Sequence, residues 1–455
     1  MKRWFMRVSI YRKILASFLL VILIGTIFFM LPITANDAPL GFIDALFTAV
    51  SATCVTGLST IVVKDQFNIL GQILMLIMIQ IGGLGLFTIL ASVTLAIQKR
   101  TSLNQKLIMK ELVSLTSITG FRRMMNQIVR YTLLIEGIGT LLLCFVFVPE
   151  YGMAQGIFNA LFTAVSAFCN AGFDNLGSSS LMAYYSNPLL CIVVMVLIVL
   201  GGLGFIVAFD VWDKWKKKKA DGLSFKKFKA SLLLHSKLVL GLTFLLITIP
   251  AILIFVLEFN NPMTLGNLSL GDKIINALFS SVTLRTAGFA TLSMENFKQA
   301  SSLIMMLGMF IGGSPGGTAG GIKTTTFLVL VMYIIGAMRG RNEYVVHKRT
   351  IAQATISRAF LVVGLNIFIL FVGVFLLLIS EDGLFLTVAF EAVSALATVG
   401  LSMGITASLT AFGKLVIVAM MFLGRVGIIT FALSVLPKKK KSDDIHYVEG
   451  SIIVG

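Results

Sequence analysis

Charged side chains are scarce in this sequence, and their scarcity excludes an ordinary soluble domain. Charged residues make up 13% and hydrophobic residues 57% of the 455 residues, whereas a soluble domain carries about 25% charged residues. Histidine is rarer still: three occur, each in a segment expected outside the membrane. No acid, base, nucleophile or metal cluster lies within the apolar runs, so neither a histidine-based catalytic centre nor a membrane enzyme is expected.

Cysteine is also rare. The four cysteines, Cys54, Cys144, Cys169 and Cys191, lie in apolar stretches without the spacing of metal ligands. We expect them to be small buried hydrophobic side chains.

Long apolar runs are abundant instead. Several approach or exceed the roughly 20 residues that span a bilayer, namely 14–31, 69–97, 189–209, 238–257, 361–379 and 414–436. The first has a longer apolar core than a signal peptide and a counterpart later in the chain, so we expect it to be retained. The sequence predicts a polytopic membrane protein.

The basic residues are clustered. Of the 37 Lys and Arg residues, 30 fall in the segments 2–13, 99–130, 214–237, 339–358 and 438–441. These clusters occupy every second connection, which is the positive-inside pattern and predicts cytoplasmic termini. We interpret them as topology signals with anionic lipid contact as a secondary benefit, and no nucleic-acid partner is expected.

Internal repeats organise the chain. The octapeptide at 45–52 recurs unchanged at 160–167, and related segments lie at 277–283 and 389–395. Each leads into a glycine, and these four glycines, Gly57, Gly172, Gly288 and Gly400, are 115, 116 and 112 residues apart. A second landmark begins 25, 29, 24 and 24 residues later, at Gly82, Gly201, Gly312 and Gly424.

Each repeat therefore predicts an apolar span, a short helix of about 10 to 12 residues that is too short to cross, a glycine turn and a second span. The fold class is an all-α polytopic membrane protein with four parallel span–pore-loop–span repeats, that is, eight transmembrane helices and four re-entrant pore helices around one pore per protomer. The expected divisions are an N-terminal segment 1–13, repeats 14–97, 131–210, 238–338 and 359–436, linkers 98–130, 211–237 and 339–358, and a tail 437–455.

The loop tips before the four glycines form a candidate cation filter. Small, hydroxyl-bearing and β-branched residues in extended backbone can aim successive carbonyl oxygens at one axis, and a carbonyl ring can replace the hydration shell of potassium. The negative ends of the short helices favour a cation there. The alternative, glycines for helix packing, is disfavoured by four copies in register. The candidates are Val55, Thr56, Gly57, Asn170, Ala171, Gly172, Thr286, Ala287, Gly288, Thr398, Val399 and Gly400.

These motifs and repeats resemble the Ktr/Trk/HKT potassium transporter superfamily, and most closely its KtrB-type membrane subunits, over roughly residues 10 to 436. The resemblance implies potassium translocation, a homodimer and a cytoplasmic ring of KtrA-type RCK subunits. It places nucleotide (ATP/ADP or NAD) on that partner only, and potassium as substrate without a covalent cofactor. In related plant transporters serine at the position of Gly57 accompanies sodium preference, so all four glycines match the potassium-type pattern.

The second span of the third repeat is interrupted. It contains Gly312, Gly313, Ser314, Pro315, Gly316, Gly317, Thr318, Ala319, Gly320 and Gly321. Glycine and proline cost about 1 to 3 kcal/mol each in a helix, so this helix must break. A phosphate-binding loop is excluded, because Ile322 separates Gly321 from Lys323. The remaining readings are a passive kink or a flexible gate under the filter, and KtrB-type proteins are similar here.

Three lone charged residues complete the candidate site. Arg425 replaces the second landmark glycine of the other repeats, and we expect it to face the axis beneath the filter as a barrier to potassium, or else to anchor carbonyls. Arg285 is expected to point away from the ion path and to brace the filter, against Glu391 or Asp174. Glu136 is expected to snorkel toward the inner surface.

Two questions stay open at this level. The chain contains no nucleotide motif, so the basic segments 212–237, 339–349 and 438–455 are either docking sites for a regulatory subunit or lipid-facing. A sodium-coupled symporter is the alternative to channel-like potassium uptake. The expected location is a bacterial cell membrane with multiple crossings.

Overall fold

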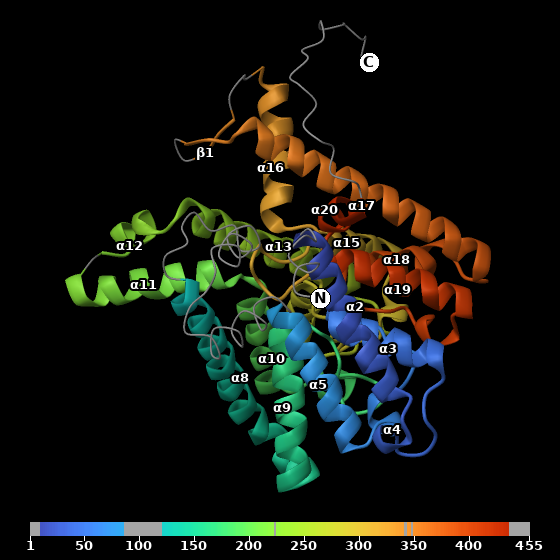
Figure 1. The fold of residues 1–455 in the computed structure, drawn as a ribbon. Coiled ribbons are helices and arrows are strands. Elements are labelled where there is room, and N and C mark those ends of the chain that lie inside the picture. Colours follow the sequence, from blue (N-terminus) through green and yellow to red (C-terminus); the bar gives the residue numbers. More distant parts are fainter. Residues whose placement is uncertain (1–9, 86–120, 223, 341–343, 347–348, 436–455) are drawn as a thin grey trace, which may run out of the picture.

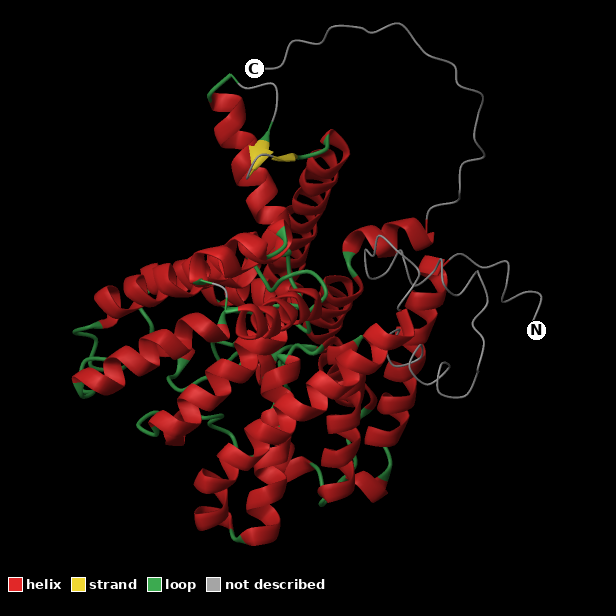
Figure 2. Cartoon of the chain, turned by 90° about the vertical axis from the view of Figure 1, so that its left-hand side faces the viewer, coloured by secondary structure: helices red, strands yellow, loops and turns green. Residues whose placement is uncertain are grey.

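Helices dominate the structure, a computed structural model that describes residues 10–85, 121–222, 224–340, 344–346 and 349–435. The one sheet in these ranges is an antiparallel hairpin of β1 (Val345–Val346) and β2 (Arg349–Thr350) beyond the end of α16 (Thr324–Met338) (Figure 2). The expected N-terminal segment 1–13, linker 98–130 and tail 437–455 lie wholly or largely outside the described residues.

The remaining helices follow one another in chain order. They are α2 (Ile10–Phe29), α3 (Phe42–Cys54), α4 (Val63–Gln66), α5 (Ile69–Leu84), α8 (Phe121–Tyr151), α9 (Met153–Cys169), α10 (Pro188–Gly202), α11 (Phe205–Asp221), α12 (Phe225–Ser231), α13 (Leu234–Glu258), α14 (Leu270–Thr283), α15 (Gln299–Phe310), α17 (Gln353–Ser380), α18 (Phe385–Ala397), α19 (Ala411–Val426) and α20 (Ile428–Val435). Short 3-10 turns lie at Pro32–Thr34, Met182–Tyr184, Met294–Asn296 and Thr406–Ser408.

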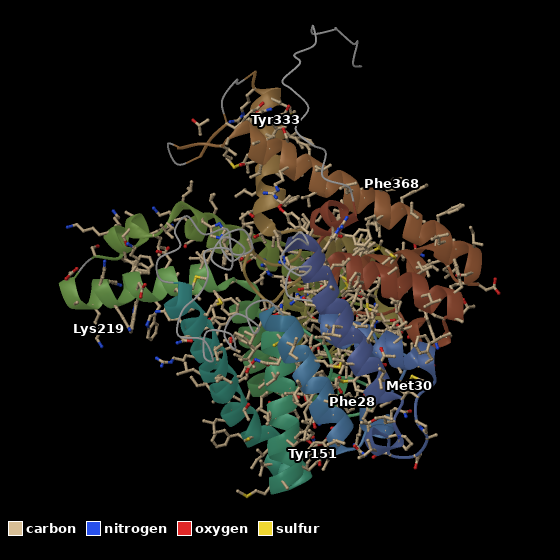
Figure 3. The ribbon with its side chains drawn as sticks, viewed as in Figure 1. Phe28, Met30, Tyr151, Lys219, Tyr333 and Phe368 are labelled. Carbon is tan, nitrogen blue, oxygen red and sulfur yellow. The ribbon has the colours of Figure 1, made fainter. Side chains whose placement is uncertain are left out.

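Four of the described helices, α2, α8, α13 and α17, are long and apolar enough to cross a membrane by themselves. Their outer faces carry exposed apolar side chains such as Phe28 on α2 and Phe368 on α17, which are 42% and 63% exposed (Figure 3). Exposed apolar surface of this extent needs a nonpolar environment, as expected of membrane spans.

Four short helices form the interior. The octapeptide copies lie in α3, α9, α14 and α18, which have 13, 17, 14 and 13 residues. Their last turns are buried almost completely, because alanine and serine let neighbouring backbones approach. The prediction of short helices ahead of each glycine turn is confirmed in position, with lengths slightly above the expected ones.

The helices that follow the loop tips link these short helices into a closed order. The contacts run α3–α5–α9–α10–α14 in the first half, and α15–α18–α19–α3 in the second. The fourth unit therefore returns to the first. The ion pair between Lys414 on α19 and Asp44 on α3, at 2.7 Å, lies on this closing contact. Arg12 of α2 also donates to the Ser434 carbonyl of α20 at 2.7 Å.

The second spans are interrupted more often than the sequence predicted. We expected one break, in the third repeat, but α10 and α11 are separated at Gly204 (φ +89°) by a bend of 101°. Helices α19 and α20 are separated at Gly427 (φ +86°), and α5 ends at Gly85 (φ +78°). The runs 189–209 and 414–436 are thus not continuous helices, since the last landmark glycine adopts a left-handed backbone that a helix cannot contain.

The cysteine prediction is confirmed for three residues. Cys54, Cys169 and Cys191 are buried free thiols, whereas Cys144 is half-buried.

Candidate functional site

The four loop tips at 53–57, 168–172, 284–288 and 396–400 meet at one point. A Cβ atom added to any of the four glycines would come within 3.0 Å of a carbonyl oxygen of another tip. The pairs run in order around a ring: Gly57 with Ala171, Gly172 with Ala287, Gly288 with Val399, and Gly400 with Thr56. All twelve residues that the sequence singled out therefore come together, and their backbones approach too closely for any side chain at the glycines.

The backbone of each tip follows one pattern. The residue two positions before each glycine is left-handed, with φ of 57° at Val55, 59° at Asn170, 63° at Thr286 and 51° at Thr398. The glycines themselves have φ of 97°, 71°, 82° and 95°, and the residue between lies outside the positive-φ region. The sign of φ thus alternates from residue to residue along each tip. This alternation lets the carbonyl oxygens of successive residues point to the same side of the backbone. The sequence singled out this residue but did not predict its left-handed backbone, because Val and Thr rarely adopt positive φ.

Hydrogen bonds from the short helices hold these conformations. The Ser51 and Ser394 hydroxyls accept from the Gly57 and Gly400 N–H groups at 3.1 Å each. In the third tip the Thr283 hydroxyl instead donates to the Phe289 carbonyl at 2.7 Å. A β-branched residue at positive φ costs of the order of 1–3 kcal/mol, and such bonds compensate for that strain.

The second glycine landmark lies directly beneath the tips. An added Cβ would meet the Thr53 carbonyl oxygen at Gly82, the Phe168 carbonyl oxygen at Gly201 and the Leu396 carbonyl oxygen at Gly424, each closer than 3.0 Å. The contacted residue is four positions before the tip glycine in all three cases. The third repeat departs from this pattern, because Gly312 faces the Gly320 carbonyl instead.

A cavity of about 390 Å³ lies on one side of the ring and is lined by all four tip glycines. Asp174 and Glu295 also line it, so it is a polar mouth. Burial raises the pKa of Asp174 to about 6, even though the Leu176 N–H donates to its carboxylate at 3.1 Å.

On the other side lies the loop 312–321, which we call the glycine loop. Its ends are joined by a parallel bridge between Ile311 and Ile322 and by the Thr324 N–H, which donates to the Gly313 carbonyl at 3.1 Å. The segment is therefore a loop whose two ends lie side by side between α15 and α16, in agreement with the predicted break in this span.

The glycine loop is hydrogen-bonded to the tips of the second and third repeats and to the second-repeat landmark. The Thr318 hydroxyl donates to the Phe168 carbonyl at 3.1 Å, and the Gly320 N–H donates to the Thr286 hydroxyl at 3.2 Å. The Ser314 N–H donates to the Gly202 carbonyl at 3.0 Å. The loop is thus held directly against the ring.

Two cations hold the carbonyl groups of this loop. Arg425 donates from Nη1 to the Thr318 carbonyl and from Nη2 to the Gly82 carbonyl, so it joins the loop to the first repeat. The Lys323 ammonium donates to the Ala319 carbonyl at 2.7 Å. Arg425 thus binds carbonyl groups, as the alternative reading expected, and its role as a barrier to potassium stays a prediction. Lys323 was missed, although a lysine inside an apolar span was itself a signal.

Two expectations about single charges are wrong. Arg285 is 3% exposed, and its Nη atoms have no hydrogen-bond partner in the described part of the chain. It forms no ion pair with Glu391 or Asp174. Glu136 does not snorkel: it is 4% exposed and accepts from the Gln80 amide at 3.3 Å behind α9. Single-residue charge patterns do not show which face of a helix is covered by its neighbours.

An apolar helical assembly with exposed nonpolar outer faces and an interior ring of main-chain oxygen atoms defines a multi-pass membrane transport protein. The TrkH family, described as "Cation transport protein", matches residues 8–444. The chain belongs to this family, which confirms the expected resemblance and makes it a transporter and not an enzyme.

Curated relatives match over nearly the full chain. The chain is 40% identical over 439 residues to Ktr system potassium uptake protein B of Bacillus subtilis (strain 168), covering 96% of this chain and 95% of that protein. It is 38% identical to the potassium/sodium uptake protein NtpJ of Enterococcus hirae, covering 100% of this chain and 99% of that protein. It is 37% identical to Ktr system potassium uptake protein B of Vibrio alginolyticus, covering 98% of this chain and 94% of that protein.

A solved structure has the same fold. The crystal structure of the potassium transporter TrkH from Vibrio parahaemolyticus superposes with a TM-score of 0.72 at 18% identity, and the match covers 92% of this chain and 84% of that one.

Proposed function

We propose that this chain is the pore-forming subunit of a Ktr-type potassium uptake system in a bacterial cell membrane. The observation that carries the proposal is the closed ring of loop tips, each with a left-handed residue two positions before a left-handed glycine. Carbonyl oxygens ordered in this way can substitute for water around a monovalent cation. The names of the curated relatives point to potassium as that cation.

The architecture fits four parallel span–pore-loop–span repeats around one pore, with eight crossings and the divisions expected from the sequence. Four helices cross alone and the bent pair α10–α11 supplies a fifth. Helix α5, the pair α15 and α16 on either side of the glycine loop, and α19 supply the other three crossings in this proposal. The cyclic contact order of the short helices supports the fourfold arrangement, and the basic clusters support cytoplasmic termini.

The glycine loop serves as the gate, and we interpret its hydrogen-bonded position against the ring as the closed state. Its carbonyl groups at Thr318 and Ala319, which would otherwise be free to coordinate a passing cation, are occupied by Arg425 and Lys323. Fixed positive charge beneath a cation filter also repels potassium. Opening requires these bonds to be exchanged for others.

Control of the gate comes from a second polypeptide. The proposed partner is a cytoplasmic KtrA-type RCK ring that carries the nucleotide, as the Ktr names of the relatives support. Two pore subunits form a homodimer in this proposal, and the basic segments face either the ring or the lipid.

The test is cation selectivity in proteoliposomes. Gly57→Ser puts a side chain into left-handed backbone against the Ala171 carbonyl, so we expect discrimination of potassium over sodium to fall about tenfold, equivalent to about 1.4 kcal/mol. Gly41→Ser is the matched control, because Gly41 precedes α3, the helix that leads to Gly57, and nothing lies within 4 Å of a Cβ atom added to Gly41. Unaltered discrimination in Gly57→Ser would remove the ring from the ion path.

A sodium-coupled potassium symporter is the second candidate, and the name of the Enterococcus hirae relative, a potassium/sodium uptake protein, favours it. Reversal potentials with and without a sodium gradient separate the two functions. A reversal potential set by potassium alone excludes coupling, whereas a shift with the sodium gradient establishes it.

A further inference from the structure

A second cavity is lined by residues of α8, α10, α11 and α13 and by none of the loop-tip residues. These four helices are labelled in Figure 1. Its volume is about 520 Å³, within the range of about 300–1,000 Å³ typical of ligand sites. The walls are apolar side chains such as Leu134, Val207 and Leu240. An apolar cavity of this size beside membrane spans accepts a hydrocarbon chain.

The rim of the cavity is polar and aromatic. Trp212 and Trp215 stack at 5.7 Å between ring centroids and are 54% and 46% exposed. Tryptophan in such a position is typical of the membrane–water interface. Arg130 and Asp213 also line the rim, so one acidic group opposes the basic ones.

Basic residues outnumber the acidic ones on the helices of this rim, since α11 carries Asp210, Asp213 and Asp221 and α12 carries no acidic residue. Helix α11 carries Lys214, Lys216, Lys217, Lys218 and Lys219, and α12 adds Lys226, Lys227 and Lys229. Lys219 lies at the outer edge of the molecule (Figure 3). Clusters of four to eight basic residues on a helix beside a span are typical of binding to anionic phospholipid headgroups.

Helix α11 also connects the cavity to the glycine loop. Its first residue, Phe205, donates its N–H to the Gly316 carbonyl at 3.0 Å. Three residues later along the same rigid helix, Ala208 lines the cavity. A ligand that fixes the angle of α11 therefore acts on the loop through a single hydrogen-bonded contact.

We propose that this cavity holds one acyl chain of an anionic phospholipid from the cytoplasmic leaflet, with the headgroup phosphate at Arg130 and the lysines of α11, and that the bound lipid steadies α11 against the glycine loop. The leaflet assignment rests on the proposed topology, and the effect on the loop rests on the proposed gate.

The two rim tryptophans serve as the probe. The chain has three tryptophans, so Trp4→Phe leaves fluorescence from Trp212 and Trp215 alone. We expect phosphatidylglycerol with brominated acyl chains to quench this fluorescence more than brominated phosphatidylcholine at the same low mole fraction. Arg130→Gln should lower that preference about fivefold, the effect expected of one basic side chain at an anionic surface.

Ala208→Phe fills the cavity and should abolish the preference, whereas Ala220→Phe at the exposed end of α11 should retain it. Rubidium uptake should rise with phosphatidylglycerol in wild type and in Ala220→Phe, but not in Ala208→Phe. Because quenching needs no transport, it tests the site even if the proposed function fails.

Equal quenching by the two lipids, or a preference unchanged in Ala208→Phe, would overturn the site. Quenching by neither lipid would mean that protein fills the cavity, and would overturn it as well. A quenching preference without any effect of phosphatidylglycerol on uptake would overturn the connection to the loop.

Discussion

Arg425 shows at the scale of one residue how a mid-membrane charge can be retained. Its guanidinium binds the carbonyl groups of Thr318 and Gly82, which belong to different repeats. Hydrogen bonds to a charged group contribute about 1.5–3 kcal/mol each. The side chain therefore strengthens the contact between the glycine loop and the first repeat. Arginine suits this role because its planar fork reaches two acceptors at once.

Replacing Arg425 by alanine should release the loop. Loss of a hydrogen bond of about 1.5 kcal/mol to the loop shifts the equilibrium between the closed and the open loop roughly tenfold toward the open state. Basal rubidium uptake without the soluble partner should therefore rise by about that factor. Arg425→Lys keeps the charge but not the two-acceptor fork, and its uptake should be intermediate. Flux in proteoliposomes measures this, and an unchanged rate in Arg425→Ala would contradict the gate.

At the scale of elements, the short helices and the breaks beneath them act as a unit. The landmark glycines Gly82, Gly201 and Gly424 let the following helix approach the carbonyl end of the short helix. These carbonyl groups end their helices and lack intrahelical partners. Close approach at this point fixes the position of the tip relative to the broken helix below it.

Gly201→Ala tests this packing. The added methyl group would overlap the Phe168 carbonyl oxygen, and overpacking costs typically about 1–3 kcal/mol, so the unfolding temperature in detergent should fall. Gly241→Ala is the matched control, because this glycine lies within α13 with nothing within 4 Å of an added Cβ atom. We expect Gly241→Ala to match or exceed wild type, since alanine favours a helix by about 1 kcal/mol. Equal stability of the two variants would contradict the close approach.

The sequence predicted these elements unevenly. The repeated octapeptide was sufficient to predict the four short helices, because near-identical segments in register must bury the same faces. It was not sufficient to predict the bend at Gly204, since glycine permits a left-handed backbone without requiring it. The left-handed backbone of Val55, a residue that the sequence did single out, was not predicted for the opposite reason: local preference opposes this conformation, and only the surrounding tertiary contacts impose it. The environments of Arg285 and Glu136 likewise depend on packing between distant segments.

At the scale of the whole molecule, charge is distributed asymmetrically along the ion path. Asp174 and Glu295 line the cavity at the loop tips, whereas Arg425 and Lys323 bind the glycine loop on the other side of the ring. Acidic groups at a mouth raise the local concentration of cations, and basic groups beneath the ring oppose their passage while the loop is closed. In the proposed orientation, the field of the molecule favours entry of a cation from outside and its retention at the ring.

Asp174 makes that field depend on external pH. Burial raises the pKa of its carboxyl group to about 6, so the negative charge is present above pH 6 and is lost as the pH falls through it. The charged residues near Asp174 are Glu295, which lines the same cavity, and Lys64, which donates to the Leu176 carbonyl at 3.3 Å. One charge at about 4 Å in water contributes about 1 kcal/mol. The apparent KM for potassium should therefore rise about fivefold between pH 7 and pH 5, with little change in the maximal rate.

Asp174→Asn should show the high KM at both pH values, whereas Asp65→Asn, at an exposed position, should keep the wild-type profile. A pH profile identical in wild type and Asp174→Asn would assign the titration to another group, because the two proteins differ only in the Asp174 carboxyl.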